Sequence, residues 1–104
     1  MIARWWRGWA ATPENADAYE QLLKSTILPW VESHEGHRGS YLVRREVDEG
    51  VEFATLTLWE SLDSVRAFAG EDYELAVVPD AARAVLSRWD KRSSHYEVLV
   101  GPES

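Results

Sequence analysis

LTLWESLDSVRAF, residues 56–68, contains the end of a strand and the start of a helix. Residues 51–59 alternate between two sets of side chains, and a period of two predicts a strand with two different faces. Either Ser61 or Asp63 then offers a side-chain oxygen that can cap the first turn of a helix. Gly70 ends this helix. Its apolar residues lie three or four apart and form one stripe: Leu62, Val65, Phe68 and Ala69.

The segment before this stretch predicts a second strand that pairs with the first. Residues 40–47 also alternate in polarity, and Asp48, Glu49 and Gly50 form a short turn between the two runs. Two strands joined by a short turn that contains glycine are typical of a β-hairpin.

The N-terminal part of the chain predicts one strand followed by one amphipathic helix. Residues 2–9 are rich in β-branched and aromatic side chains, as strands are. Thr12 supplies a helix cap, and Pro13 suits the first turn. We expect Pro29 to kink or end the helix, because it lacks an N–H and crowds the preceding turn. The apolar side of this helix consists of Ala16, Tyr19, Leu22, Leu23, Thr26, Ile27 and Trp30.

The remainder of the chain completes the fold. Residues 79–88 predict a shorter helix that begins at a proline, and residues 95–100 predict the last strand. The elements then follow in the order β-α-β-β-α-β, with one irregular helical insertion, which is the ferredoxin-like plan of the α+β class. We predict a single domain over residues 1–100 and a disordered tail at residues 101–104.

Composition restricts the classes of function. The chain has 104 residues, and 11 Lys or Arg against 18 Asp or Glu give a formal net charge of −7. Such an acidic chain is unsuited to nonspecific contact with nucleic acid or an anionic membrane, so we expect neither as a partner. It has no cysteine, which excludes disulfides and thiolate catalysis. Residues 1–7 lack the apolar core of a signal peptide, so we expect a cytoplasmic protein.

Three stretches resemble one family, the antibiotic-biosynthesis-monooxygenase-like branch of the dimeric α+β barrel proteins. They are residues 1–9, the turn at residues 36–39 and, most tellingly, residues 56–68. Residues 69–74 and 95–98 are similar to an uncharacterised bacterial subgroup. The resemblance implies a homodimer in which two four-stranded sheets form a barrel with the helices outside. It also implies a pocket in each subunit between the sheet and the helices.

The activities found in that family differ. Members include cofactor-independent oxygenases of polycyclic phenols, quinol oxygenases and haem-degrading enzymes; related barrels include isomerases, and others have no known activity. The haem-degrading branch uses an Asn, a Trp and a His, whose positions match Arg7, Phe68 and Val78 here. Valine cannot bind iron. The resemblance therefore argues against haem degradation, unless His34, His37 or His95 supplies a ligand, and we expect no cofactor.

Histidines are the candidate bases. His95 begins the last predicted strand, and imidazole titrates near neutrality, so it can deprotonate a phenol. Its alternative role is a structural hydrogen bond at the start of a strand. His34 and His37 flank Glu35, a grouping with which a metal site is compatible. A solvated loop explains that grouping more simply, and we predict no metal.

The six tryptophans are too many to hide easily in one small core. Each ring alone is more often a core or interface residue, and Trp5 and Trp9 suit a dimer contact equally well. As a set, five aromatic residues are candidates for the wall of a pocket that binds a flat ligand: Trp6, Trp9, Trp59, Phe68 and Tyr73.

Arginines are the candidates for binding an anionic group or an enolate-like charge: Arg7, Arg44 and Arg66. Ordinary surface ion pairs explain all three equally well. Arg7 is the best exception, because it lies among aromatic residues.

These observations predict a cofactor-independent monooxygenase that acts on a small electron-rich aromatic molecule of the phenol or quinol type. His95 is the predicted base and Arg7 the second catalytic residue. Two alternatives stay open: a non-oxidative isomerase, cyclase or dehydratase of the same fold, and a small-molecule-binding protein without turnover. All three need the same apolar pocket.

Overall fold

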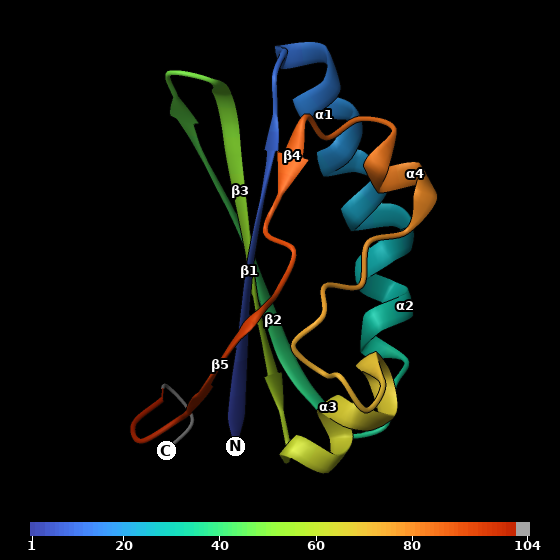
Figure 1. The fold of residues 1–104 in the computed structure, drawn as a ribbon, viewed down its shortest axis with the longest axis vertical. Helices are drawn as coiled ribbons and strands as arrows, with labels where there is room; N and C mark the ends of the chain where they lie inside the picture. The colour runs from blue at the N-terminus through green and yellow to red at the C-terminus, as the bar shows by residue number, and fades with distance from the viewer. Residues whose placement is uncertain (102–104) are drawn as a thin grey trace.

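The computed structural model describes residues 1–101 and shows a five-stranded antiparallel sheet with one layer of helices against it (Figure 1). The strand order is β2-β3-β1-β4, and β5 pairs with β1 beside β4. Strand β1 therefore lies in the centre of the sheet. The strands are β1 Ile2–Ala10, β2 His37–Val47, β3 Gly50–Trp59, β4 Arg88–Trp89 and β5 Ser94–Glu97.

All the helices of the described chain lie on the same side of the sheet (Figure 1). They are α1 Pro13–Leu22, the π-helix Leu23–Ile27, α2 Leu28–Glu32, α3 Leu62–Ala69 and α4 Asp80–Arg83. The arrangement confirms the predicted α+β class and ferredoxin-like fold. None of these helices is long and apolar enough to cross a membrane.

The predicted helix starts are confirmed in detail. The Thr12 hydroxyl accepts a hydrogen bond from the backbone N–H of Asn15 at 3.2 Å. Of the two candidates for the second helix, Ser61 is the cap, and its hydroxyl accepts from the N–H of Ser64 at 3.2 Å. Gly70 ends that helix with a φ of 96°, a value that favours glycine.

Pro29 does not end the first helical segment, which continues to Glu32. The turn before it, Leu23–Ile27, is π-helical, and the N–H of Leu28 donates to the carbonyl of Leu23, five residues earlier. This wider turn shifts the hydrogen-bond register just ahead of Pro29. The proline thus occupies the first turn of α2, where no backbone N–H is required.

The predicted helix over residues 79–88 is too long. Helix α4 ends at Arg83, and Arg88–Trp89 form the short strand β4 instead. The N–H of Ser87 donates to the carbonyl of Trp9 at 2.7 Å, which draws this segment onto the sheet edge. A long-range pairing that local periodicity does not encode thus overrides the helical pattern.

Strands β2 and β5 differ from the prediction by three residues at one end, and the other predicted strand limits agree to within one residue. Strand β2 begins at His37 rather than Ser40, with an irregularity of register between His37 and Gly39. Strand β5 ends at Glu97 rather than Val100, because Glu97 already pairs with Ile2, the first residue of β1. Of the predicted tail, residues 102–104 lie outside the described residues.

The core is built on the helix-facing side of the sheet. Its largest fully buried side chains are Trp59, Tyr19 and Phe53, and Phe53 meets Tyr19 edge-on at 4.9 Å between ring centroids. The opposite side of the sheet carries no helix in the described chain (Figure 1). The two faces of β1 therefore have different surroundings.

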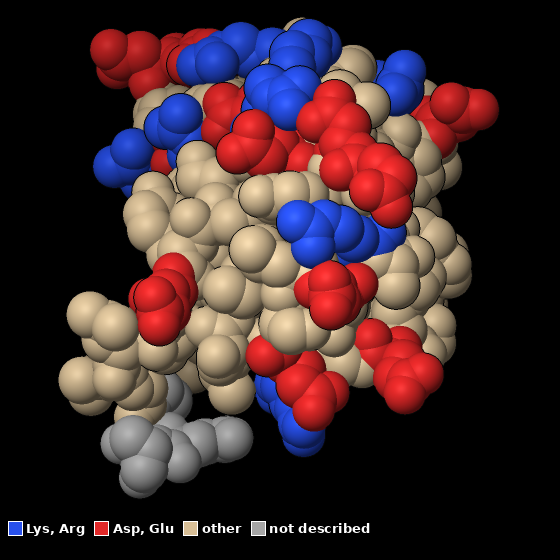
Figure 2. Space-filling model, turned by 60° about the horizontal axis from the view of Figure 1, so that its bottom comes forward, with Lys and Arg blue, Asp and Glu red and all other residues tan. Residues whose placement is uncertain are grey.

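Positive and negative side chains lie close together on the surface of the molecule. On the face shown in Figure 2, Lys and Arg side chains are interleaved with Asp and Glu at the upper end, and acidic groups are scattered over the mostly uncharged area below. Opposite charges of the described chain form several ion pairs, such as Arg92 with Asp72 and Arg38 with Glu60.

Candidate functional site

A cavity lies between the sheet and the helices. Its volume is about 70 Å³, which is room for roughly five water molecules. The first helical segment contributes Tyr19, Leu23, Ile27, Leu28 and Val31, two of them from the π-helical turn. The sheet contributes Trp6, Thr55 and Thr57, and Phe68 comes from α3.

The irregular segment between α3 and α4 closes the cavity with Val77, Val78 and Pro79. It is joined to the sheet side by a few long-range backbone hydrogen bonds, such as the N–H of Ala76 to the carbonyl of Lys91 at 2.9 Å. Ligand sites commonly enclose roughly 300–1,000 Å³. An aromatic ligand of several rings therefore requires this wall to move outward.

Arg4 is the one charged residue that lines the cavity within residues 1–101. Its residue exposure is 5 %. Its guanidinium donates to the carbonyls of Tyr73 and Leu75 and lies 2.9 Å from Nε2 of His95. No Asp or Glu of the described chain forms an ion pair with it. Burial lowers the pKa of Arg4 to about 10, so it stays charged at neutral pH.

His95 lies opposite Arg4 in the β1–β5 ladder. A guanidinium can only donate, so Nε2 is the acceptor and the neutral ring carries its proton on Nδ1. Nδ1 is buried and has no hydrogen-bond partner within the described residues. Burial, followed by the charge of Arg4, lowers the pKa of His95, and Glu74 acts in the opposite direction. The imidazole is therefore held in the uncharged form that a base requires.

Ser93 completes this polar end of the cavity. It precedes β5, lines the cavity and is only 4 % exposed. Its hydroxyl oxygen is buried and makes no hydrogen bond within the described residues. A buried hydroxyl without a partner is unusual, because desolvating it costs free energy that nothing returns.

Four of the five predicted aromatic residues lie at or behind this cavity. Trp6 and Phe68 line it. Trp59 lies behind Phe68, stacked on it at 5.1 Å between centroids, and its indole N–H donates to Thr57 Oγ1. Tyr73 meets the ring of His95 edge-on at 5.0 Å. The structure thus brings Trp6, Trp59, Phe68, Tyr73 and His95 into one region.

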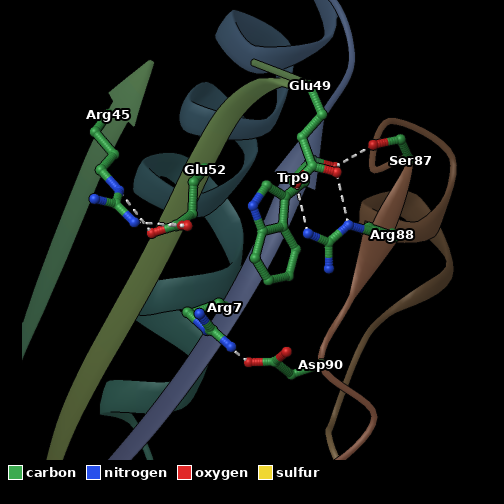
Figure 3. A network of polar contacts seen from close by, with 8 residues as sticks. All are labelled: Arg7, Trp9, Arg45, Glu49, Glu52, Ser87, Arg88 and Asp90. Carbon is green, nitrogen blue, oxygen red and sulfur yellow. Dashed lines mark hydrogen bonds and ion pairs between the residues drawn. The ribbon is translucent and has the colours of Figure 1, made fainter. Parts of the chain in front are cut away.

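Arg7 and Trp9 lie on the other face of the sheet, away from this cavity (Figure 3). Arg7 donates to the carboxylate of Asp90 at 3.0 Å. Trp9 is 3 % exposed, because the guanidinium of Arg88 lies over its ring at 3.5 Å. Next to them is a hollow lined by Trp5, Arg7, Val43, Arg44, Arg45, Glu52 and Ala54.

The other predicted polar candidates have local partners. Arg44 pairs with Glu20 at 2.9 Å, and Arg66 pairs with Asp63 at 3.1 Å. His34 Nδ1 lies 2.9 Å from the carbonyl of Trp30, and His37 Nε2 lies 2.7 Å from the Ser40 hydroxyl. Within residues 1–101 no three His, Asp or Glu side chains gather in a way that could hold a metal ion.

The antibiotic biosynthesis monooxygenase family model matches residues 8–80 of this chain, which is more than half of it. The chain belongs to the antibiotic biosynthesis monooxygenase family. No curated protein matches it. The family match covers the hairpin, α3 and the segment that closes the cavity, and it ends where α4 begins.

Several solved structures share the fold at low identity. A Deinococcus radiodurans protein described as an antibiotic biosynthesis monooxygenase has a TM-score of 0.69 and 16 % identity, over 97 % of this chain and 95 % of its own. An arginine variant of MhuD with two manganese protoporphyrin IX molecules per active site has a TM-score of 0.62 and 18 % identity, over 97 % of both chains. The ActVA-Orf6 monooxygenase of Streptomyces coelicolor, in complex with nanaomycin D, has a TM-score of 0.56 and 13 % identity, over 97 % of this chain and 91 % of its own.

Two of the three positions that the sequence resemblance matched to haem-degrading enzymes are cavity walls. Phe68 and Val78 both line the cavity with hydrocarbon, and neither side chain has an atom that binds iron. The third, Arg7, lies on the opposite face of the sheet.

Arg4 and Ser93 are the residues that the sequence prediction missed. Alternation along residues 2–9 puts Arg4 on the same face as Trp6, so a signal for Arg4 was present. Nothing local marks Ser93, because its position depends on how β5 pairs with β1.

Proposed function

We propose that this protein is a cofactor-independent monooxygenase that acts in the cytoplasm on a small electron-rich aromatic molecule of the phenol or quinol type. The observation that carries the proposal is the cavity. Trp6 and Phe68 offer it aromatic walls, and the buried Arg4 lines its one charged end. The half-buried His95 lies behind Arg4, with Nε2 2.9 Å from the guanidinium. Family membership supports the oxygenase chemistry.

The proposed reaction needs only the substrate and dioxygen. Arg4 first moves away from Nε2 of His95, so that this nitrogen can reach the substrate oxygen. His95 then takes the phenolic proton directly. The apolar walls keep water out of the site. The phenolate passes one electron to dioxygen, and the two radicals combine at the ring carbon para to the oxygen. Loss of water then converts that C–H into a carbonyl. One oxygen atom enters the product, the other leaves as water, and the substrate supplies all the electrons.

Known ligands of fold relatives support a small-molecule site. One relative is described with nanaomycin D and another with manganese protoporphyrin IX. The aromatic walls favour a flat ring system, because stacked and edge-on contacts add to the burial of apolar area.

The test is oxygen uptake with purified protein and a panel of phenols, hydroquinones and anthrones, with no cofactor added. We expect uptake equal to the substrate consumed, and one labelled oxygen atom per product when ¹⁸O₂ is used. His95→Ala should lose most of the rate, while Arg38→Ala, an exposed residue that pairs with Glu60 away from the cavity, should keep it. Normal turnover by His95→Ala at every pH tested would remove His95 as the base.

Arg7 stays a separate prediction. From its place on the outer face it can act only on a ligand that reaches the hollow beside Trp5. Arg7→Ala belongs in the same panel, and an unchanged rate would confine the chemistry to the cavity.

Two other outcomes identify the alternatives. A new product formed without oxygen uptake would indicate an isomerase, cyclase or dehydratase. Tight binding with no product at all would indicate a binding protein.

We further propose that two copies associate through the uncovered face of the sheet. This face carries Ala3, Trp5, Ala54, Leu56 and Leu58, and Tyr41 is 52 % exposed there. Sedimentation at micromolar concentration should give about twice the chain mass of 11.9 kDa. Leu56→Glu should give the single-chain mass, and a wild-type mass near 12 kDa would refute the dimer.

A further inference from the structure

We infer that the Arg4 end of the cavity binds a single negatively charged oxygen group, a carboxylate or a phenolate, of an otherwise apolar ligand. The inference rests on the proposed function and deepens it, because it assigns the charge of the ligand and the atoms that recognise it. The property that it assigns is binding, so it can be tested without any turnover.

The first argument is the missing counter-ion. Arg4 is 5 % exposed, and its contacts are the carbonyls of Tyr73 and Leu75 and the neutral ring of His95. These partners satisfy hydrogen bonds but do not neutralise a charge. Burying a cation without an anion is costly. The more exposed Arg7 and Arg45, by contrast, each have a carboxylate partner.

The second argument is the number of free donors. A guanidinium has five N–H groups. The described contacts use two on Nη1 and one on Nη2, so Nε and Nη2 each keep one N–H. Two N–H groups on neighbouring nitrogens match the two oxygens of a carboxylate. A phenolate oxygen can accept from one of them.

The third argument is Ser93, which is independent of Arg4. Its hydroxyl lines the cavity, is buried and has no partner within the described residues. A ligand oxygen would give this hydroxyl the acceptor that the fold does not provide. The walls otherwise consist mainly of apolar side chains, with Tyr19 and two threonines, so the ligand presents mostly hydrocarbon away from this end.

The contacts of Arg4 with Tyr73 and Leu75 also suit a purely structural role, in which it holds the closing segment. That role explains why a donor is present but not why the donor is charged. It also leaves the unpartnered hydroxyl of Ser93 unexplained. The two roles make different predictions for Ser93→Ala, because only ligand binding needs this hydroxyl.

The test is calorimetric binding of benzoate against benzamide. The two probes have nearly the same shape and differ in charge, and both are small enough to need little movement of the closing segment. We expect benzoate to bind at least about 10-fold more tightly, as hydrogen bonds to a charged group imply. Binding of 4-nitrophenol, measured at pH values on both sides of its ionisation, separates phenolate from carboxylate recognition.

Variants decide which atoms are responsible. Arg4→Gln should weaken benzoate binding by about 10- to 100-fold and leave benzamide binding little changed. Ser93→Ala should weaken benzoate binding by about 3- to 10-fold without loss of fold stability, because its hydroxyl holds nothing in the fold. Arg45→Gln, on β2 and away from the cavity, is the matched control and should bind benzoate normally.

Each outcome decides for or against the inference. Equal affinity for benzoate and benzamide overturns it, and so does unchanged benzoate binding by Ser93→Ala, even if Arg4→Gln fails to fold. Benzoate selectivity without oxygen uptake on any phenol keeps the inference and rejects the oxygenase. Oxygen uptake without benzoate selectivity keeps the oxygenase and rejects the inference.

Discussion

Strand β1 places arginine and tryptophan on both faces of one sheet, with opposite consequences. On the face that meets the helices, Arg4 and Trp6 line the cavity. On the other face, Arg7 and Trp9 belong to a network of ion pairs and cation–π contacts (Figure 3). The same residue types thus line a cavity in one case and form an outer network in the other.

The two faces differ in whether a carboxylate neutralises the charge of the arginine. Arg7 is partly exposed and has Asp90 as a partner at 3.0 Å. Arg4 is buried and has only neutral partners. Residue type therefore does not identify a binding arginine, whereas burial without a counter-ion does. The predictions below test this contrast, from the largest expected effect to the smallest.

Trp59→Ala should lower the free energy of unfolding by about 3–5 kcal/mol, the range for removing a large buried aromatic side chain. Trp59 is fully buried, stacks on Phe68 and donates to Thr57. Trp5→Ala, on the uncovered face, should cost less, and its cost should depend on protein concentration if that face is a dimer interface. Urea unfolding at two protein concentrations measures both.

Trp59→Phe is the matched control, because it keeps a ring against Phe68 and loses only the indole N–H. It should retain most of the stability that Trp59→Ala loses. Equal losses for Trp59→Ala and Trp5→Ala, at every concentration, would show that the two faces do not differ as described.

Arg4→Met should lower the free energy of unfolding by about 2 kcal/mol, because it leaves the carbonyls of Tyr73 and Leu75 without their donor. The effect should be local. Hydrogen exchange should therefore quicken in residues 73–77 more than in the β2–β3 hairpin. Uniform quickening over the whole chain would argue that Arg4 supports the global fold rather than the closing segment.

The parts of the fold that could be predicted are those that depend on residues close together in the sequence. The alternation in residues 51–59, the caps at Thr12 and Ser61 and the break at Gly70 all depend on near neighbours in the chain. Strand β4 could not be predicted, because its two residues are extended only through pairing with Gly8 and Trp9.

The candidate site likewise contains residues that the sequence could predict and residues that it could not. The sequence named Trp6 and Phe68 as pocket candidates, and both line the cavity. His95 as the base stays a prediction. The sequence favoured Arg7 over Arg44 and Arg66 because it lies among aromatic residues, a criterion that Arg4 also meets. Arg4 lies 5.7 Å from the Phe68 ring centre, and Arg7 lies 5.1 Å from that of Trp9. Only the position of the helix layer distinguishes the two.

The pH dependence of stability should reveal His95. Burial and the charge of Arg4 lower its pKa in the folded protein. In mild acid the unfolded chain therefore binds more protons at this position than the folded chain does. The free energy of unfolding falls as the pH drops below about 6.5, and it levels off below the pKa that His95 has in the folded protein. His95→Gln should remove this part of the slope, whereas His34→Gln should keep it. Urea midpoints between neutral and mildly acidic pH test this, and parallel profiles for wild type and His95→Gln would contradict it.

Arg7→Met should have the smallest effect, about 0–1 kcal/mol, because a partly exposed pair with Asp90 gains little attraction in water and salt screens it further. The methyl end of Met can still cover the ring of Trp9, over which Arg7 now lies. Added salt should reduce the difference between wild type and Arg7→Met but not that between wild type and Arg4→Met, since the Arg4 contacts are buried. A loss for Arg7→Met that matches the loss for Arg4→Met, unchanged by salt, would mean that the outer network supports the fold as strongly as the cavity does. The contrast between the two faces of β1 would then no longer identify which arginine serves a ligand.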